Sequence, residues 1–148
     1  MGAVSDADGM CILYTEEEWH SYSDIDFKPV EGALRSPEAV HAIINIMREE
    51  INGLQALNAE MQKTIGKINR LNCGLVLAFT CETTPRMKRV QESMQKRIAF
   101  LKNDAPEGDL KNQAIKTAEQ GIQLLNANLK LLNQYQQAAQ SHGAYILS

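Results

Sequence analysis

The fold is decided by residues 44–79, which read INIMREEINGLQALNAEMQKTIGKINRLNCGLVLAF. Apolar residues recur there at alternating steps of three and four, and the positions between them are mostly polar. One seam holds Ile44, Ile51, Asn58, Ile65, Asn72 and Phe79, and the other holds Met47, Leu54, Met61, Ile68 and Leu75. A strict seven-residue repeat lets such a stripe wrap around a partner helix. The stretch therefore predicts a coiled coil or a helical bundle.

Local signals set the expected helix boundaries. Ser36-Pro37-Glu38 supplies a preferred N-cap, a proline at the first helical position and an acid at the positive helix end, so a helix is predicted over 37–80. Thr84-Pro85 repeats this start signal and predicts a second helix over 85–103. The loop at 103–109, NDAPEGD, breaks the periodicity and precedes a third predicted helix at about 110–140.

These segments predict an all-α protein. Short loops join antiparallel neighbours, so residues 36–148 should form one domain, an elongated antiparallel three-helix bundle or a coiled-coil hairpin. The helix predicted at 85–103 is too short to cover the one at 37–80. Part of the apolar seam is therefore expected to stay open, as a dimer interface or as a groove for an amphipathic helix of another protein.

Residues 1–35 differ from the rest in charge and pattern. They hold eight acidic and two basic residues, against ten acidic and thirteen basic residues in 36–148. They lack helical periodicity and predict a largely non-helical arm that is disordered or loosely docked. Its sharper interpretation is a recognition segment anchored by Trp19, the only tryptophan in the chain.

Two sets of seam residues are candidates for binding or specificity. Asn58 and Asn72 lie in the same seam, two heptads apart, and either fix the register and the choice of partner or are simply half exposed. On the third helix, Leu125, Leu129, Leu132 and Tyr135 are the predicted partner-binding residues, although most of them should also serve the core.

No pattern in the sequence indicates catalysis. Cys11, Cys73 and Cys81 form no CxxC pair, and His20, His41 and His142 are scattered, so neither a metal site nor any cofactor is expected. There is no phosphate-binding glycine loop, nucleophile elbow or HExxH motif, and an enzyme is not expected. No apolar run is long enough to span a bilayer and no signal peptide is visible, which favours the cytoplasm.

The third helix resembles a known family. The run Leu124–Leu132, LLNANLKLL, is similar to the N-x-N-x-x-L-L segment of the flagellar export chaperone FlgN family, and Glu50 followed by Leu54 resembles its early E-x-x-x-L helix. The resemblance implies long antiparallel helices without enzymatic activity. It also implies a cytoplasmic chaperone that holds hook–filament junction subunits through their C-terminal helices before export.

Two other classes of protein compete with this interpretation. The heptads alone favour a self-associating coiled coil or adaptor whose acidic arm regulates assembly, as a homodimer for example. A third hypothesis is nucleic-acid binding through the basic helix at 85–103, although no aromatic residues alternate with its charges, so it is the least favoured. A chaperone should be monomeric or weakly dimeric alone, whereas a structural coiled coil should form a stable oligomer.

Overall fold

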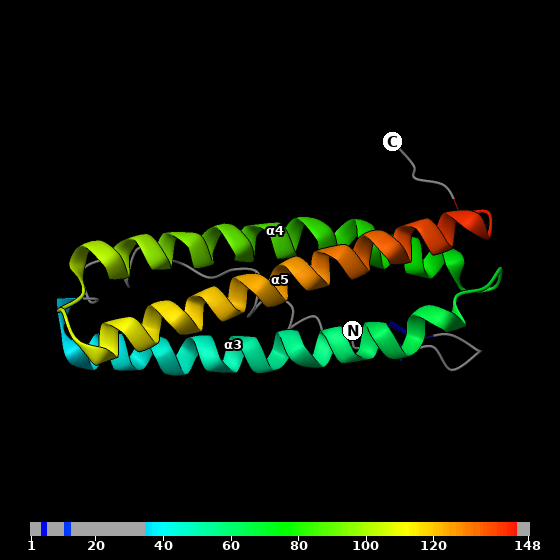
Figure 1. Cartoon of the computed structure of the whole chain (residues 1–148). Helices are drawn as coiled ribbons and strands as arrows, with labels where there is room; N and C mark the ends of the chain where they lie inside the picture. The colour runs from blue at the N-terminus through cyan, green and yellow to red at the C-terminus, as the bar shows by residue number, and fades with distance from the viewer. Residues whose placement is uncertain (1–3, 6–10, 13–34, 145–148) are drawn as a thin grey trace.

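The computed structural model describes residues 4–5, 11–12 and 35–144 (Figure 1). Three long helices make up most of this part of the chain: α3 (Pro37–Thr64), α4 (Cys73–Asp104) and α5 (Asp109–Ser141). A short 3-10 helix, η2 (Ile65–Lys67), follows α3, and strand β1 (Val4–Ser5) pairs antiparallel with β2 (Cys11–Ile12). The predicted all-α, elongated three-helix bundle is confirmed.

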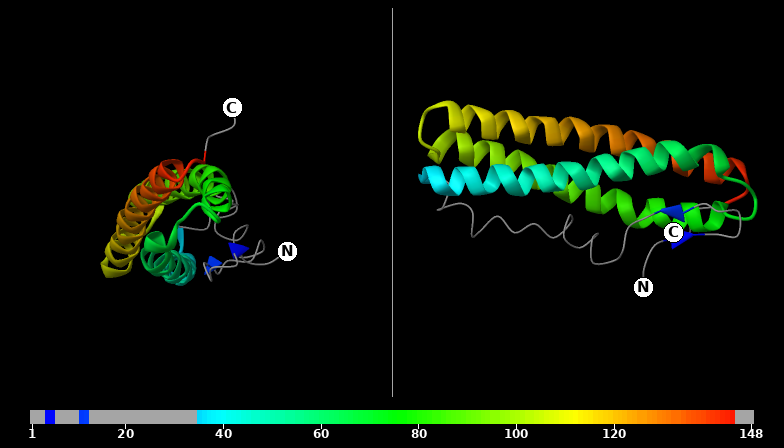
Figure 2. Two further views of the ribbon diagram at one scale, coloured as in Figure 1. Left: turned by 90° about the vertical axis from the view of Figure 1, so that its right-hand side faces the viewer. Right: turned by 90° about the horizontal axis from the view of Figure 1, so that it is seen from below.

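The last helix holds the bundle together. α3 runs out, α4 returns and α5 runs out again, obliquely across the other two (Figures 1 and 2). α5 packs along both α3 and α4, whereas the backbones of α3 and α4 approach each other closely at isolated points only; β2 lies against α3. The core is therefore built chiefly from two helix pairs that share α5.

Each helix buries one seam whose members are spaced by alternating steps of three and four residues. On α3 the predicted series Met47, Leu54 and Met61 is buried. The other predicted series is displaced by one residue, because Ile51, Asn58 and Ile65 are only half-buried while Glu50, Leu57 and Thr64 are buried in their place. On α3 the buried seam is Val40, Ile43, Met47, Glu50, Leu54, Leu57, Met61 and Thr64. On α4 it is Cys73, Val76, Thr80, Thr83, Met87, Val90, Met94, Arg97 and Leu101. On α5 it is Lys111, Ala114, Ala118, Gly121, Leu125, Asn128, Leu132, Tyr135 and Ala139.

The prediction of one continuous helix over 37–80 is wrong, because the chain turns back between Ile65 and Asn72. Two asparagines offer the backbone other hydrogen bonds there. Asn69 Oδ1 accepts from the N–H groups of Leu71 (2.8 Å) and Asn72 (3.2 Å). The Asn72 side chain donates to Lys67 O (3.0 Å) and accepts from Asn69 N–H (2.8 Å). Asn72 is therefore a buried clamp of the turn, not a residue that sets register between helices.

The predicted helix start at Thr84-Pro85 is also wrong, because Pro85 lies inside α4. A proline within a helix removes one backbone hydrogen bond. Pro85 is exposed, while Thr83 and Met87 on either side of it are fully buried in the seam. Burial of the seam on both sides of Pro85 offsets the free-energy cost of the lost hydrogen bond. The helix predicted at 85–103 is therefore the second half of α4.

The loop between α4 and α5 lies within the predicted 103–109, and the bounds of α5 agree with the predicted third helix to within one residue. Lys111, a buried member of the α5 seam, closes this loop. Its Nζ donates to Lys102 O (2.9 Å) in the last turn of α4 and pairs with Glu107 (2.6 Å). A cation at the negative end of a helix is favourable. The three helices have 28, 32 and 33 residues, so the argument that a short second helix leaves a seam open no longer holds.

Candidate functional site

The residues predicted to bind a partner on the third helix lie mainly inside the bundle. Leu125 and Tyr135 are 0% exposed and Leu132 is 1% exposed, while Leu129 is half-buried and packs against the core. Another protein cannot reach the first three unless the bundle opens. They belong to the core, as was expected for most of this set, and partner binding through them stays a prediction. Trp19 lies outside the described residues.

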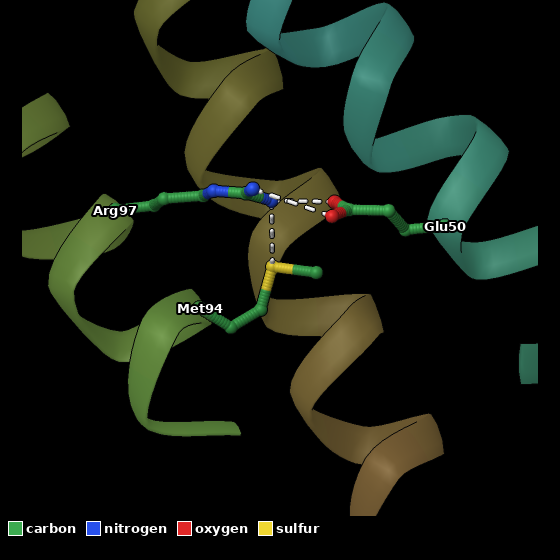
Figure 3. A network of polar contacts seen from close by, with 3 residues as sticks. All are labelled: Glu50, Met94 and Arg97. Carbon is green, nitrogen blue, oxygen red and sulfur yellow. Dashed lines mark hydrogen bonds and ion pairs between the residues drawn. The ribbon is translucent and has the colours of Figure 1, made fainter. Parts of the chain in front are cut away.

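A buried ion pair joins α3 to α4 (Figure 3). Arg97 donates from Nη1 to Glu50 Oε1 (2.5 Å) and from Nη2 to Glu50 Oε2 (3.3 Å). Met94 Sδ lies 3.9 Å from Nη1 on the same face of α4. Burial raises the pKa of the Glu50 carboxyl above its usual value, and the hydrogen bond and charge of Arg97 oppose that rise. This bidentate contact orients both side chains and links α3 to α4, whose backbones lie apart.

Asn58 pairs within the chain rather than with another molecule. Its Nδ2 donates to Oδ1 of Asn128 (2.8 Å), a fully buried residue on α5. Asn128 in turn donates to Leu54 O (3.2 Å), and Gln62 donates to Asn58 Oδ1 (2.7 Å). A buried amide pair of this kind penalises any slip of one helix along the other. The register that Asn58 helps to set is therefore that of α3 against α5.

A second polar contact joins the same two helices one heptad further on. The hydroxyl of Tyr135 donates to Met61 O (3.1 Å) and is hydrogen-bonded to the hydroxyl of Thr64. The ring of Tyr135 packs against Phe79 of α4, with 6.4 Å between the ring centroids and planes inclined at 57°. Burial raises the pKa of Tyr135 to about 12, with the Thr64 hydrogen bond opposing that rise. Tyr135 therefore links α5 both to the end of α3 and to α4.

A surface groove of about 410 Å³ lies between α3 and α5. Two cations line it, Arg48 from α3 and Lys116 from α5, together with Ile51, Asn52, Gln113, Thr117 and Gln120. No lining residue is acidic. Ile51 is half-buried, and Thr117 donates to Gln113 O (2.8 Å) within its own helix. The groove therefore combines a small apolar floor with amide rims and a positive charge on each side.

A second surface feature lies where α4 begins. Leu71 is 81% exposed and Leu75 is 48% exposed, which contradicts the placement of Leu75 in the buried seam. The other large exposed apolar side chain in the described part of the chain is Ile46 on α3, at 46%. No charged residue occurs from Leu71 to Cys81. Leucines exposed side by side in an uncharged run are typical of contact surfaces between proteins.

The described residues contain no cluster of histidine, cysteine and carboxylate side chains that could hold a metal ion. Within residues 35–144 the cysteines are free: Cys73 is buried with its thiol 3.6 Å from Arg70 O, and Cys81 is exposed. Among the helices of residues 35–144, none is both long and apolar enough to cross a bilayer. The geometry of the described residues is that of a helical bundle with a surface groove between α3 and α5 and two exposed leucines near the start of α4.

Comparison with known proteins adds no relative to this description. No family model, no curated protein and no solved structure matches the chain.

The groove could hardly be predicted from the sequence, whereas the buried polar contacts follow a recognisable spacing. Arg48 and Lys116 occupy ordinary polar positions of their helices, and only the pairing of α3 with α5 brings them together. Arg97 and Asn128, by contrast, fall on the seams when steps of three and four are counted regardless of polarity. Assigning seam positions by their spacing alone, without requiring an apolar residue, would have predicted that Arg97 and Asn128 are buried.

Proposed function

We propose that this bundle is a non-enzymatic protein-binding module that holds an amphipathic helix of another protein in the groove between α3 and α5. The observation that carries this proposal is the groove itself, which two helices running in the same direction line with Arg48 and Lys116 and with no acid. A helix with an acidic edge and an apolar stripe fits such a surface.

The two helix faces that line the groove continue along the bundle with partly apolar residues. Leu124 and Leu131 follow Thr117 on α5 at intervals of seven residues, so they lie on the same side of that helix. Both are half-buried and pack against the core. On α3, Ile51 is followed seven and fourteen residues later by the half-buried Asn58 and Ile65. An incoming helix of several turns would therefore meet a partly apolar floor along its length.

The partner class proposed here is the one that the FlgN resemblance implies. A cytoplasmic export chaperone would hold the helices of hook–filament junction subunits before their secretion. Such a role needs a stable helical scaffold, an open groove and no catalytic chemistry, and the described residues supply the first two. The identity of the client rests on the resemblance alone.

The test is a binding titration with the hook–filament junction subunits encoded by the same genome, measured by calorimetry. Arg48→Glu together with Lys116→Glu should weaken binding more than tenfold, because two favourable charge contacts become repulsive. Lys88→Glu with Lys96→Glu is the matched control, since it makes the same charge change on exposed positions of α4. Absence of binding to the wild-type chain would refute the client assignment. Equal losses of affinity in both variants would refute binding in the groove.

A self-associating structural or adaptor protein is the second candidate. The exposed pair Leu71 and Leu75 favours it, because these side chains are not part of the groove and a second copy of the chain could bury them. In this second candidate the acidic arm, residues 1–35, regulates assembly. Most of the arm lies outside the described part of the chain. The two candidates use different surfaces, so they can be tested separately.

A further inference from the structure

We infer that the outer face at the start of α4 binds the same face of a second copy of this chain, with the two helices antiparallel about an axis near Val76. This apolar face consists of Leu71, Gly74, Leu75, Ala78 and Cys81, all of them exposed. The inference is independent of the proposed groove, because it uses another surface and another readout.

The apolar face is shaped by how α4 begins. Asn69 caps the turn before the helix by accepting from Leu71 and Asn72, and Cys73 N–H donates to Asn69 O (3.0 Å) in the helical pattern. Leu71 lies in this turn, directly before the N-cap Asn72, and Leu75 follows it in the first turn of α4; both side chains are exposed. The opposite side of α4 is occupied, since Val76 and Leu77 are buried there. The helix is consequently apolar on both sides over this stretch.

The charges at the two ends of the apolar face specify the orientation of a second copy. Arg70 precedes it and Glu82 follows it, and both are exposed. In a parallel pair Arg70 would meet Arg70 and Glu82 would meet Glu82. In an antiparallel pair each end of the contact holds one Arg70 and one Glu82. Glu82 already pairs with Arg86 (3.1 Å) but keeps 63% of its side chain exposed, so it remains accessible to a second cation.

The sizes of the residues fit the same antiparallel arrangement. In a twofold contact, residue i of one copy meets residue j of the other and the reverse. With the axis near residue 76, Gly74 meets Ala78 and Leu71 meets Cys81. Small residues at the centre let two helices approach closely, and the larger Leu71 fills the space toward each end. A Cβ built on Gly74 meets nothing within 4 Å, so the space above it is open in the single chain.

A face of about three helical turns is small for a permanent dimer, so a weak one is expected, with a Kd of about 10 µM. The first test measures mass by light scattering after size exclusion, from about 1 µM to about 300 µM, a range that brackets this Kd. The wild-type chain should change from monomer to dimer across the range. Leu71→Asp with Leu75→Asp should raise the Kd more than tenfold. Ile46→Asp, which changes an equally exposed apolar residue on α3, should leave it unchanged.

Gly74→Leu separates binding from folding. The side chain enters open space in the monomer and replaces a glycine within a helix, so thermal stability should hold or rise. It should nevertheless abolish the dimer, because it blocks the close approach at the centre. A wild-type chain that stays monomeric throughout, or a Gly74→Leu chain that still dimerises, would overturn the inference.

Cross-linking tests the antiparallel direction. Ten residues of helix span about 15 Å, too far for Leu71→Cys to reach Cys81 in its own chain. In a chain that also carries Cys11→Ser, which removes another thiol able to cross-link, mild oxidation of Leu71→Cys should therefore yield a covalent dimer that depends on Cys81 and disappears when Cys81→Ser is added. A covalent dimer that survives Cys81→Ser would show a parallel pair and refute the antiparallel contact.

Discussion

Removing the arginine of the buried ion pair should be one of the most damaging single changes in the bundle. Arg97 is 2% exposed and Glu50 is 7% exposed, so the carboxylate cannot recover its lost partner from bulk water. Breaking one side of such a pair costs about 3–5 kcal/mol of unfolding free energy. The total unfolding free energy of a domain of this size is about 5–15 kcal/mol, so Arg97→Leu should lose a large share of the stability.

The Arg97→Leu chain should also respond to pH in a defined direction. Burial already raises the pKa of Glu50 above its unfolded value, and loss of Arg97 removes the contacts that oppose this rise. A carboxyl whose folded pKa is raised contributes stability below its unfolded pKa and loses it as the pH rises through the folded pKa. The variant should therefore regain stability as the pH falls toward the unfolded pKa of Glu50, whereas the wild-type chain should regain much less.

The assay is urea unfolding followed by circular dichroism at several pH values, with two comparison variants. Glu50→Gln with Arg97→Leu removes the charge and should abolish the regained stability. Glu50→Leu with Arg97→Leu replaces the pair by apolar side chains and should recover most of the loss, because such replacements are often neutral or stabilising. A loss below about 1 kcal/mol in Arg97→Leu, within the range of exposed ion pairs, would refute the reasoning.

Three further predictions concern the contacts of α5. Asn58→Ile should lower stability by about 1–3 kcal/mol, because the buried Asn128 loses its donor, and solution mass should not change; a rise in stability in urea unfolding would restore the register role between molecules. Tyr135→Phe should flatten the loss of stability that the wild-type chain shows between about pH 10, where an unfolded tyrosine ionises, and about pH 12; an unchanged alkaline profile would contradict this. Gly121→Ala places a Cβ 2.9 Å from Met94 Cε, the end of a flexible side chain that can shift at little cost, so the helix-propensity gain of about 1 kcal/mol should prevail and the melting temperature should hold or rise; a clear fall in the melting temperature would contradict this.

The heptad pattern was sufficient to predict the class of fold but not its connections. Met47, Leu54 and Met61 were assigned to the seam correctly, because burial in a bundle follows position in the repeat. The turn at residues 65–72 was missed because two asparagines that the repeat placed in or beside the seam bond to the backbone instead. The opposite error occurred at Pro85, where a strong local start signal was overridden by a seam that continues through it.

The candidate surfaces were harder to predict because they depend on which helices become neighbours. Leu125 and Tyr135 looked like binding residues on an isolated helix, yet α5 faces two helices and needs them for both. Leu71 lies within the segment predicted as one continuous helix, and its exposure follows from the turn that precedes α4. A single helix pattern shows which positions are apolar, but it does not show which of them are left over after packing.

The shared position of α5 has a consequence for how the chain acquires its structure during synthesis. α3 and α4 leave the ribosome first, but the seams of both are completed chiefly by a helix that is translated after them. Until α5 emerges, two long apolar stripes have little to pack against and are open to aggregation or to a folding helper. Loss of α5 through a premature stop should therefore leave no smaller stable core, and degradation should remove the whole product rather than trim it.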